Sequence, residues 1–163
     1  MLKNNYQEEF LNIINPIITH EEFLKRKEFM HHGKTTVFDH SMKVAYRAYK
    51  IAKKLKLNYK DAAIAGILHD FYYKPWQSLD RNTPLLKKHG FVHGNEASIN
   101  SLKYFPSLVN DEILDAIKKH MFPLTITPPK YKLGWVLTLA DKIESMEVIF
   151  HPSILLSFFK KTD

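Results

Sequence analysis

The chain has 163 residues, of which 45% are hydrophobic and 25% charged, as is typical of one folded domain rather than a disordered chain. It contains no cysteine, which excludes disulfide frameworks, cysteine-based zinc fingers, iron–sulfur centres and thiolate catalysis. The net charge of +7 is compatible with an anionic ligand, but the basic residues are scattered, which argues against nucleic acid as the partner. The longest uncharged apolar run, Leu133 to Ala140, is too short to cross a bilayer, and the first residues include acids where a signal peptide is apolar. We therefore expect a cytoplasmic protein with no membrane partner.

Helical periodicity dominates the chain, and no stretch shows the sustained alternation of a strand. Thr19 and Glu22 form a predicted capping box, whereas Asn58 and Asn110 are predicted N-caps of later helices. Pro16 is expected to end the first helix. The predicted helices cover residues 4–14, 19–30, 37–55, 58–70, 93–105, 110–120 and 130–150.

These elements predict an all-α bundle of roughly seven to eight helices, forming a single domain over residues 1–163. We place its core at about 31–150, with helices at 4–30 before it and a short C-terminal helix at 152–160, which Pro152 would open. The stretch 71–92 contains two prolines and many polar residues, so it is predicted to be a long loop of functional importance.

Several predicted helices carry a polar residue on the face that should be buried. Side chains three or four residues apart share a helix face, so Asp141 extends the apolar stripe of Leu133 and Leu137. By the same spacing, His40 precedes Val44 on its stripe, and His120 follows Ile117 and Ile113. The helix before the doublet His69-Asp70 is apolar on all sides and should itself be buried. The inward polar set is His40, His69, Asp70, His120 and Asp141, with His93 opening a further helix.

A buried carboxylate costs several kcal/mol unless it is paired, hydrogen-bonded or bound to a metal. Taken singly, these residues have ordinary explanations: a lone inward histidine is commonly a satisfied core residue, and Asp141 could pair with Lys142. Taken together, histidines and aspartates on separate helices indicate one shared metal site. The mixture of imidazole and carboxylate ligands suits Fe, Mn, Zn, Ni or Co better than Ca²⁺.

The order His40 … His69-Asp70 … Asp141 resembles the signature of the HD-domain superfamily, which consists of all-helical, metal-dependent phosphohydrolases. His93 and His120 resemble the two additional histidines found in members with two metals. Their spacing is most similar to that of the small hydrolases that split dinucleoside tetraphosphates and of uncharacterised bacterial relatives. Met121 stands where HD-GYP phosphodiesterases have another histidine, and no Gly-Tyr-Pro stretch is present, which argues against a cyclic-di-GMP phosphodiesterase.

The resemblance implies a metal-dependent phosphohydrolase that cleaves a phosphoester or phosphoanhydride bond of a nucleotide or other small phosphorylated compound. It implies that His69 and Asp70 take part in catalysis. A metal would activate water by lowering its pKa toward about 7, and two ions would clamp the phosphoryl oxygens. The alternative is a binding or regulatory module on the same scaffold, with a structural metal and no turnover. The implied ligands are His40, His69, Asp70 and Asp141 for one divalent ion, and Asp70, His93 and His120 for a second.

Basic and aromatic residues near the motifs are candidates for substrate binding. Lys43 lies one turn after His40, and Lys142 adjoins Asp141; for both, an ordinary surface charge is an equally good explanation. Trp76 and the neighbouring aromatic residues of the 71–92 loop could cover the site or stack on a base. A homodimer is possible. The candidate substrate-binding residues are Lys43, Lys74, Trp76, Arg81 and Lys142.

Overall fold

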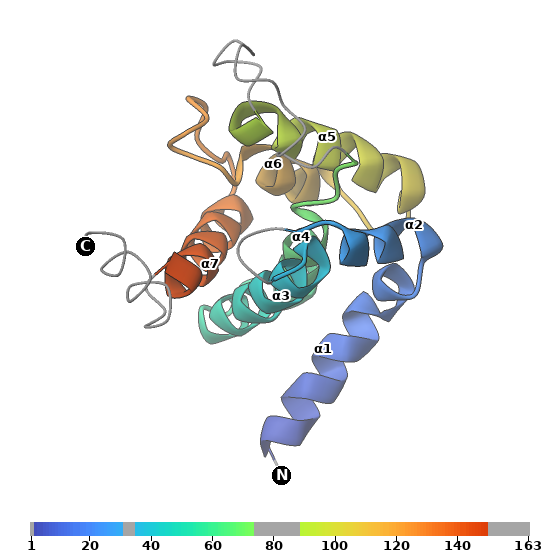
Figure 1. The fold of residues 1–163 in the computed structure, drawn as a ribbon. Helices are drawn as coiled ribbons and strands as arrows, with labels where there is room; N and C mark the ends of the chain where they lie inside the picture. Colours follow the sequence, from blue (N-terminus) through green and yellow to red (C-terminus); the bar gives the residue numbers. More distant parts are fainter. Residues whose placement is uncertain (1, 31–34, 74–88, 150–163) are drawn as a thin grey trace, which may run out of the picture.

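The computed structural model describes residues 2–30, 35–73 and 89–149. Within these ranges the protein is built from seven α-helices and one 3₁₀ helix with no β-strand, which confirms the predicted all-α class (Figure 1). Met30 and Thr36 form an isolated bridge. The predicted terminal helix at 152–160 and residues 74–88 of the predicted 71–92 loop lie outside the described residues. The elements are α1 (Leu2–Ile18), α2 (Glu21–Leu24), η1 (Lys25–Glu28), α3 (Val37–Lys54), α4 (Tyr59–Leu68), α5 (His89–Tyr104), α6 (Asp111–Lys119) and α7 (Lys132–Ile149).

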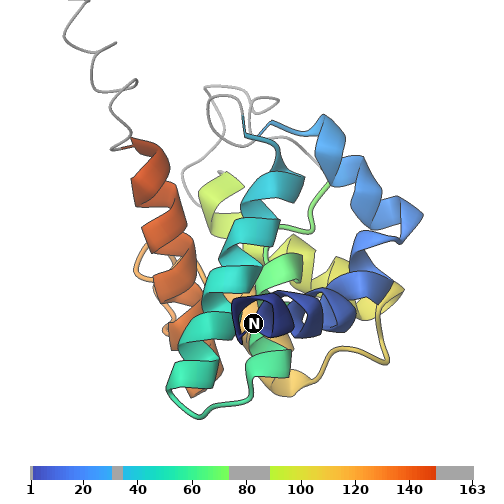
Figure 2. The ribbon, with the colours of Figure 1, turned by 90° about the horizontal axis from the view of Figure 1, so that it is seen from below.

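Helix α4 is the centre of the bundle. It packs against α1, α3, α5, α6 and α7. Figure 2 shows α3 running beside α4, with α7 along the other side of α3. Every residue from Ala62 to Leu68 is buried, as its all-round apolar sequence predicts. Burial of this segment by several neighbours therefore fixes the position of whatever follows it, which is the doublet His69-Asp70.

The contact between α3 and α4 depends on a glycine. A Cβ added at Gly66 would lie 2.5 Å from the Cα of Ala45, closer than two carbon atoms can approach. Gly66 therefore allows the two backbones to come together, and small residues on both helices maintain the close approach.

The N-terminal helices differ from the prediction. Helix α1 continues through Pro16 to Ile18, so the predicted end at Pro16 is wrong. The additional turn brings Ile17 into the core together with Ile14, and both are fully buried. The next helix is capped by His20, whose Nδ1 accepts from the backbone N–H of Glu22 at 3.2 Å. The hydroxyl of Thr19 instead donates to the Asn15 carbonyl at 2.7 Å, so the predicted capping box does not form.

The later boundaries follow the sequence more closely. Asn58 accepts from the N–H of Asp61, and Asn110 accepts from the N–H of Ile113, as their predicted N-cap roles require. Helix α5 begins at His89 rather than near His93, and therefore includes residues expected in the loop.

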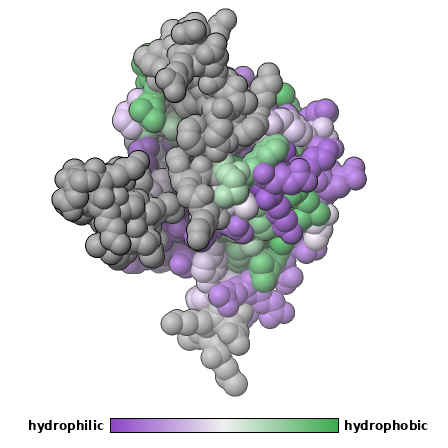
Figure 3. Space-filling view, in the orientation of Figure 1, coloured by the Kyte–Doolittle hydropathy of each residue, from purple (hydrophilic) through white to green (hydrophobic). Residues whose placement is uncertain are grey.

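The described surface is mixed in character. Figure 3 shows hydrophilic side chains over much of the face seen, with a hydrophobic area among them. Exposed large apolar residues include Leu11 on α1 and Trp135 on α7. None of the described helices combines the length and the apolar character needed to cross a membrane.

Candidate metal centre

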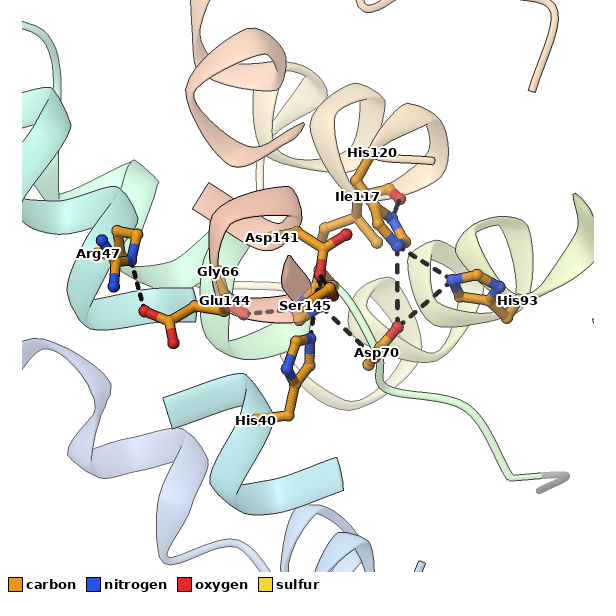
Figure 4. A network of polar contacts seen from close by, with 11 residues as sticks. His40, Arg47, Gly66, Asp70, His93, Ile117, His120, Asp141, Glu144 and Ser145 are labelled. Carbon is orange, nitrogen blue, oxygen red and sulfur yellow. Dashed lines mark hydrogen bonds and ion pairs between the residues drawn. The ribbon is translucent and has the colours of Figure 1, made fainter. Parts of the chain in front are cut away.

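Six buried side chains from five helical regions meet at the ends of α4 and α6 (Figure 4). His69 and His120 are the C-caps of α4 and α6, and Asp70 follows His69. His40 lies in the first turn of α3, His93 lies in α5, and Asp141 lies in α7. None of the six is more than 8% exposed. The set is His40, His69, Asp70, His93, His120 and Asp141.

One half of the cluster surrounds Asp141. Its Oδ1 lies 3.0 Å from Nε2 of His40 and 3.7 Å from Nε2 of His69. Nε2 of His69 also lies 3.5 Å from Oδ2 of Asp70. Three helical regions that are distant in sequence therefore direct nitrogen and oxygen donors at one point.

The other half surrounds the second oxygen of Asp70. Its Oδ1 lies 3.4 Å from Nε2 of His93 and 3.8 Å from Nε2 of His120. The two histidine nitrogens are 3.0 Å apart. Because Oδ2 faces His69 and Oδ1 faces this second pair, Asp70 stands between the two halves.

The helix ends orient two of the histidines. Nδ1 of His69 contacts the Gly66 carbonyl at 2.8 Å, and Nδ1 of His120 contacts the Ile117 carbonyl at 2.7 Å. A carbonyl can only accept, so Nδ1 carries a proton in each ring and Nε2 of each ring faces the cluster. In His120, whose ring is neutral, this Nε2 presents a lone pair. Metal-ligating histidines typically donate their other N–H in this way.

Helix α5 holds the chain that leaves the doublet. Glu96 accepts the backbone N–H of Tyr73 at 3.0 Å, and the amide of Asn100 donates to the Phe71 carbonyl at 2.8 Å. His93, Glu96 and Asn100 follow one another at intervals of three and four residues, so they share one face of the helix. This face therefore supplies a candidate ligand and fixes the backbone next to Asp70.

A glycine in α5 permits this helix to approach α6 beside His93 and His120. A Cβ added at Gly94 would lie 2.8 Å from the Lys118 carbonyl oxygen, so a larger residue would separate the helices. The neighbouring residue His93 reaches His120 because of this close approach.

The surroundings of the cluster raise the pKa of one of its members and lower the pKa of two others. Burial disfavours charge on His69, but the carboxylates of Asp70 and Asp141 raise its pKa to about 9. Burial opposes ionisation of Asp141 as well, yet contacts with His40 and His69 hold its pKa well below the usual range. Burial, together with His93 and His69, lowers the pKa of His120 to about 3, so that ring is neutral.

The donor set fits a divalent cation. Nε2 of His69 is buried and has no hydrogen-bond partner, although it faces two carboxylates. One donor atom from each of His40, His69 and Asp141 lies within 4.8 Å of the others, and the same holds for His69, Asp70 and His120. Imidazole nitrogens and carboxylate oxygens at this spacing are suitable ligands for a transition metal.

The chain belongs to the HD domain family, whose family model matches residues 37–146. The matched segment includes all six residues of the cluster. Proteins of this family are generally metal-dependent hydrolases that bind divalent metals. No curated protein matches the chain.

The predicted substrate-binding residues are only partly described. Lys43 is exposed on α3, one turn after His40. Nζ of Lys142 donates to the Phe122 carbonyl at 2.5 Å and thus ties α7 to the turn after α6. Lys74, Trp76 and Arg81 lie outside the described residues.

Tyr72, one of the loop aromatic residues expected to cover the site or stack on a base, is buried against His93, with ring centroids 5.8 Å apart. Two other residues that support the cluster were not predicted from the sequence. Glu96 and Asn100 were missed because their partners are backbone groups, which no side-chain pattern reveals. Only the three- and four-residue spacing from His93 could have pointed to them.

Asn100→Ala should destabilise the protein by about 1–3 kcal/mol, because the buried Phe71 carbonyl loses its donor. Asn95→Ala is the matched control, since Asn95 is exposed on the same helix and its loss should change stability by less than about 0.5 kcal/mol. Urea unfolding of both variants measures the difference. Equal free energies of unfolding for the two variants would contradict this role of Asn100.

Proposed function

We propose that this protein is a metal-dependent phosphohydrolase that cleaves a phosphoester or phosphoanhydride bond in a nucleotide or another small phosphorylated compound. The observation that supports it best is the two-sided arrangement around Asp70. Membership of a family of metal-dependent hydrolases supports hydrolysis as the reaction, and the buried cluster contains donor atoms that could bind the metal.

Two divalent ions fit the donors. His40, His69, Asp70 and Asp141 would hold the first, and Asp70, His93 and His120 would hold the second. Fe or Mn is the expected metal, with Zn, Ni or Co as other ions that accept these ligands. When bound, such ions activate water as a nucleophile and offset negative charge on phosphoryl oxygens.

The protein's own groups prepare this site. The Gly66 carbonyl fixes the His69 ring, and the two oxygens of Asp70 are kept on opposite sides by donors from different helices. His120 is neutral and protonated at Nδ1, so its Nε2 presents a lone pair in the 3.0 Å contact with Nε2 of His93.

The substrate proposal is narrower than the family assignment. The spacing of His93 and His120 is similar to that in the small dinucleoside-tetraphosphate hydrolases, which favours a nucleotide carrying phosphoanhydride bonds. The candidate contacts for this substrate are still Lys43, Lys74, Trp76, Arg81 and Lys142. The candidate catalytic residues are still His69 and Asp70. A homodimer and a cytoplasmic location also stay predictions.

Phosphate release by the metal-loaded protein tests the function. Protein purified without chelator, and without a metal-binding tag, would be analysed for metal, then assayed with nucleotides and other phosphate esters in Mn²⁺ and Fe²⁺. We expect release that depends on added metal and disappears with chelator. Bound metal with no turnover of any compound would favour the regulatory module instead.

Replacing His93 and His120 together by alanine should lower bound metal from near two ions per chain to near one, because the first ion keeps its four ligands. Hydrolysis should fall by about a thousandfold or more, since the second ion is worth several kcal/mol in the transition state. His20→Ala is the control, because His20 caps α2 and should leave both ions in place. A double variant that retains two ions would contradict the assignment.

A further inference from the structure

Arg47 and Glu144 join α3 to α7 beside the cluster without belonging to the six candidate ligands (Figure 4). Nε of Arg47 donates to Oε1 of Glu144. The Glu144 side chain is 10% exposed and that of Arg47 is 27% exposed, so water screens this ion pair only partly.

The register of both helices links this ion pair to the cluster. Arg47 follows His40 by two helical turns, and Glu144 follows Asp141 by one, so each pair of residues shares a helix face. The helices therefore meet at two successive points, His40 with Asp141 and Arg47 with Glu144. The hydroxyl of Ser145 lies 3.4 Å from Oδ1 of Asp141 and adds a donor on the same face.

A buried carboxylate that loses its partner is costly, so the Glu144 side chain constrains α7 to stay where Arg47 can reach it. This constraint restricts both rotation and sliding of α7 along α3. Metal affinity is sensitive to such shifts, because ligands must be held within about 0.5 Å of the binding geometry. A small displacement of α7 would move Asp141 away from His40 and His69.

We propose that Arg47 and Glu144 are positioning residues for the metal centre. Their ion pair holds α7 against α3, keeps Asp141 opposite His40, and thereby sets the affinity for the ion bound on that side. This inference rests on the proposed metal centre and concerns only how tightly the ion is held.

The chain offers a matched control on the same helix. Glu9 of α1 contacts Lys53 and Tyr49, which lie toward the other end of α3 from His40. This ion pair also joins two helices, but it fixes α1 rather than α7. Its loss should lower stability without moving Asp141.

The experiment compares metal affinity across Glu144→Gln, Arg47→Met, the double variant and Glu9→Gln. Metal-stripped protein would be titrated with Mn²⁺ by calorimetry, with circular dichroism and thermal melting recorded for each variant. Each single change at the ion pair should weaken binding by about 10- to 100-fold, as changes to groups supporting a ligand do. The double variant should bind Mn²⁺ no more weakly than the weaker-binding of the two single variants. Glu9→Gln should bind Mn²⁺ within about twofold of the unmodified protein, although it should melt at a lower temperature.

Arg47→Lys separates positioning from folding, because it retains the charge and should recover most of the affinity lost in Arg47→Met. Folded variants of Arg47 and Glu144 that bind Mn²⁺ as tightly as the unmodified protein would overturn the proposal. The proposal would also be overturned if the losses of Mn²⁺ affinity in the two single variants added together in the double variant. The same holds if Glu9→Gln lost as much affinity as the variants of Arg47 and Glu144. An unmodified protein that binds no divalent ion would overturn the metal centre as well, which distinguishes the two failures.

Discussion

Two carboxylates buried among histidines set the main constraint on this structure. Asp70 and Asp141 are each less than 10% exposed, and a charge removed from water costs several kcal/mol unless an opposite charge lies close by. The two carboxylates raise the pKa of His69 to about 9, so the protonated ring of His69 provides such a charge. A divalent cation would provide it more completely and would take the place of the proton on Nε2 of His69. The helical bundle can be understood as the framework that keeps these donors together.

Close packing of helices at glycines and contacts with backbone carbonyls hold the candidate ligands in place. Gly66 lets α3 reach α4, and Gly94 lets α5 reach the end of α6, so that side chains from separate helices meet at the ends of α4 and α6. Each histidine at a helix end uses the last free carbonyls of its own helix to fix its ring. The candidate ligands are thus held by backbone carbonyls and by close helix packing, whereas substrate choice would depend on residues around them.

Much of this arrangement was predictable from sequence because helical period alone reveals which polar residues face inward. His40, His120 and Asp141 each extend an apolar stripe, and the structure places all three within the cluster. The exception at Pro16 shows the limit of local rules, since burial of Ile17 outweighs the missing N–H of proline. Contacts such as that of Asn100 with a backbone carbonyl were not predictable, because they depend on which helices pack together. The ion pair of Arg47 with Glu144 was not predicted either, because it depends on how α3 and α7 pack together.

We propose that the two oxygens of Asp70 face two separate metal positions. Anomalous X-ray scattering from crystals grown with Mn²⁺ would locate the ions directly. We predict two peaks about 3.5–4 Å apart, one beside His40 and Asp141 and the other beside His93 and His120, with Asp70 between them. A single peak at saturating Mn²⁺, or peaks away from these side chains, would contradict a two-metal centre divided by Asp70.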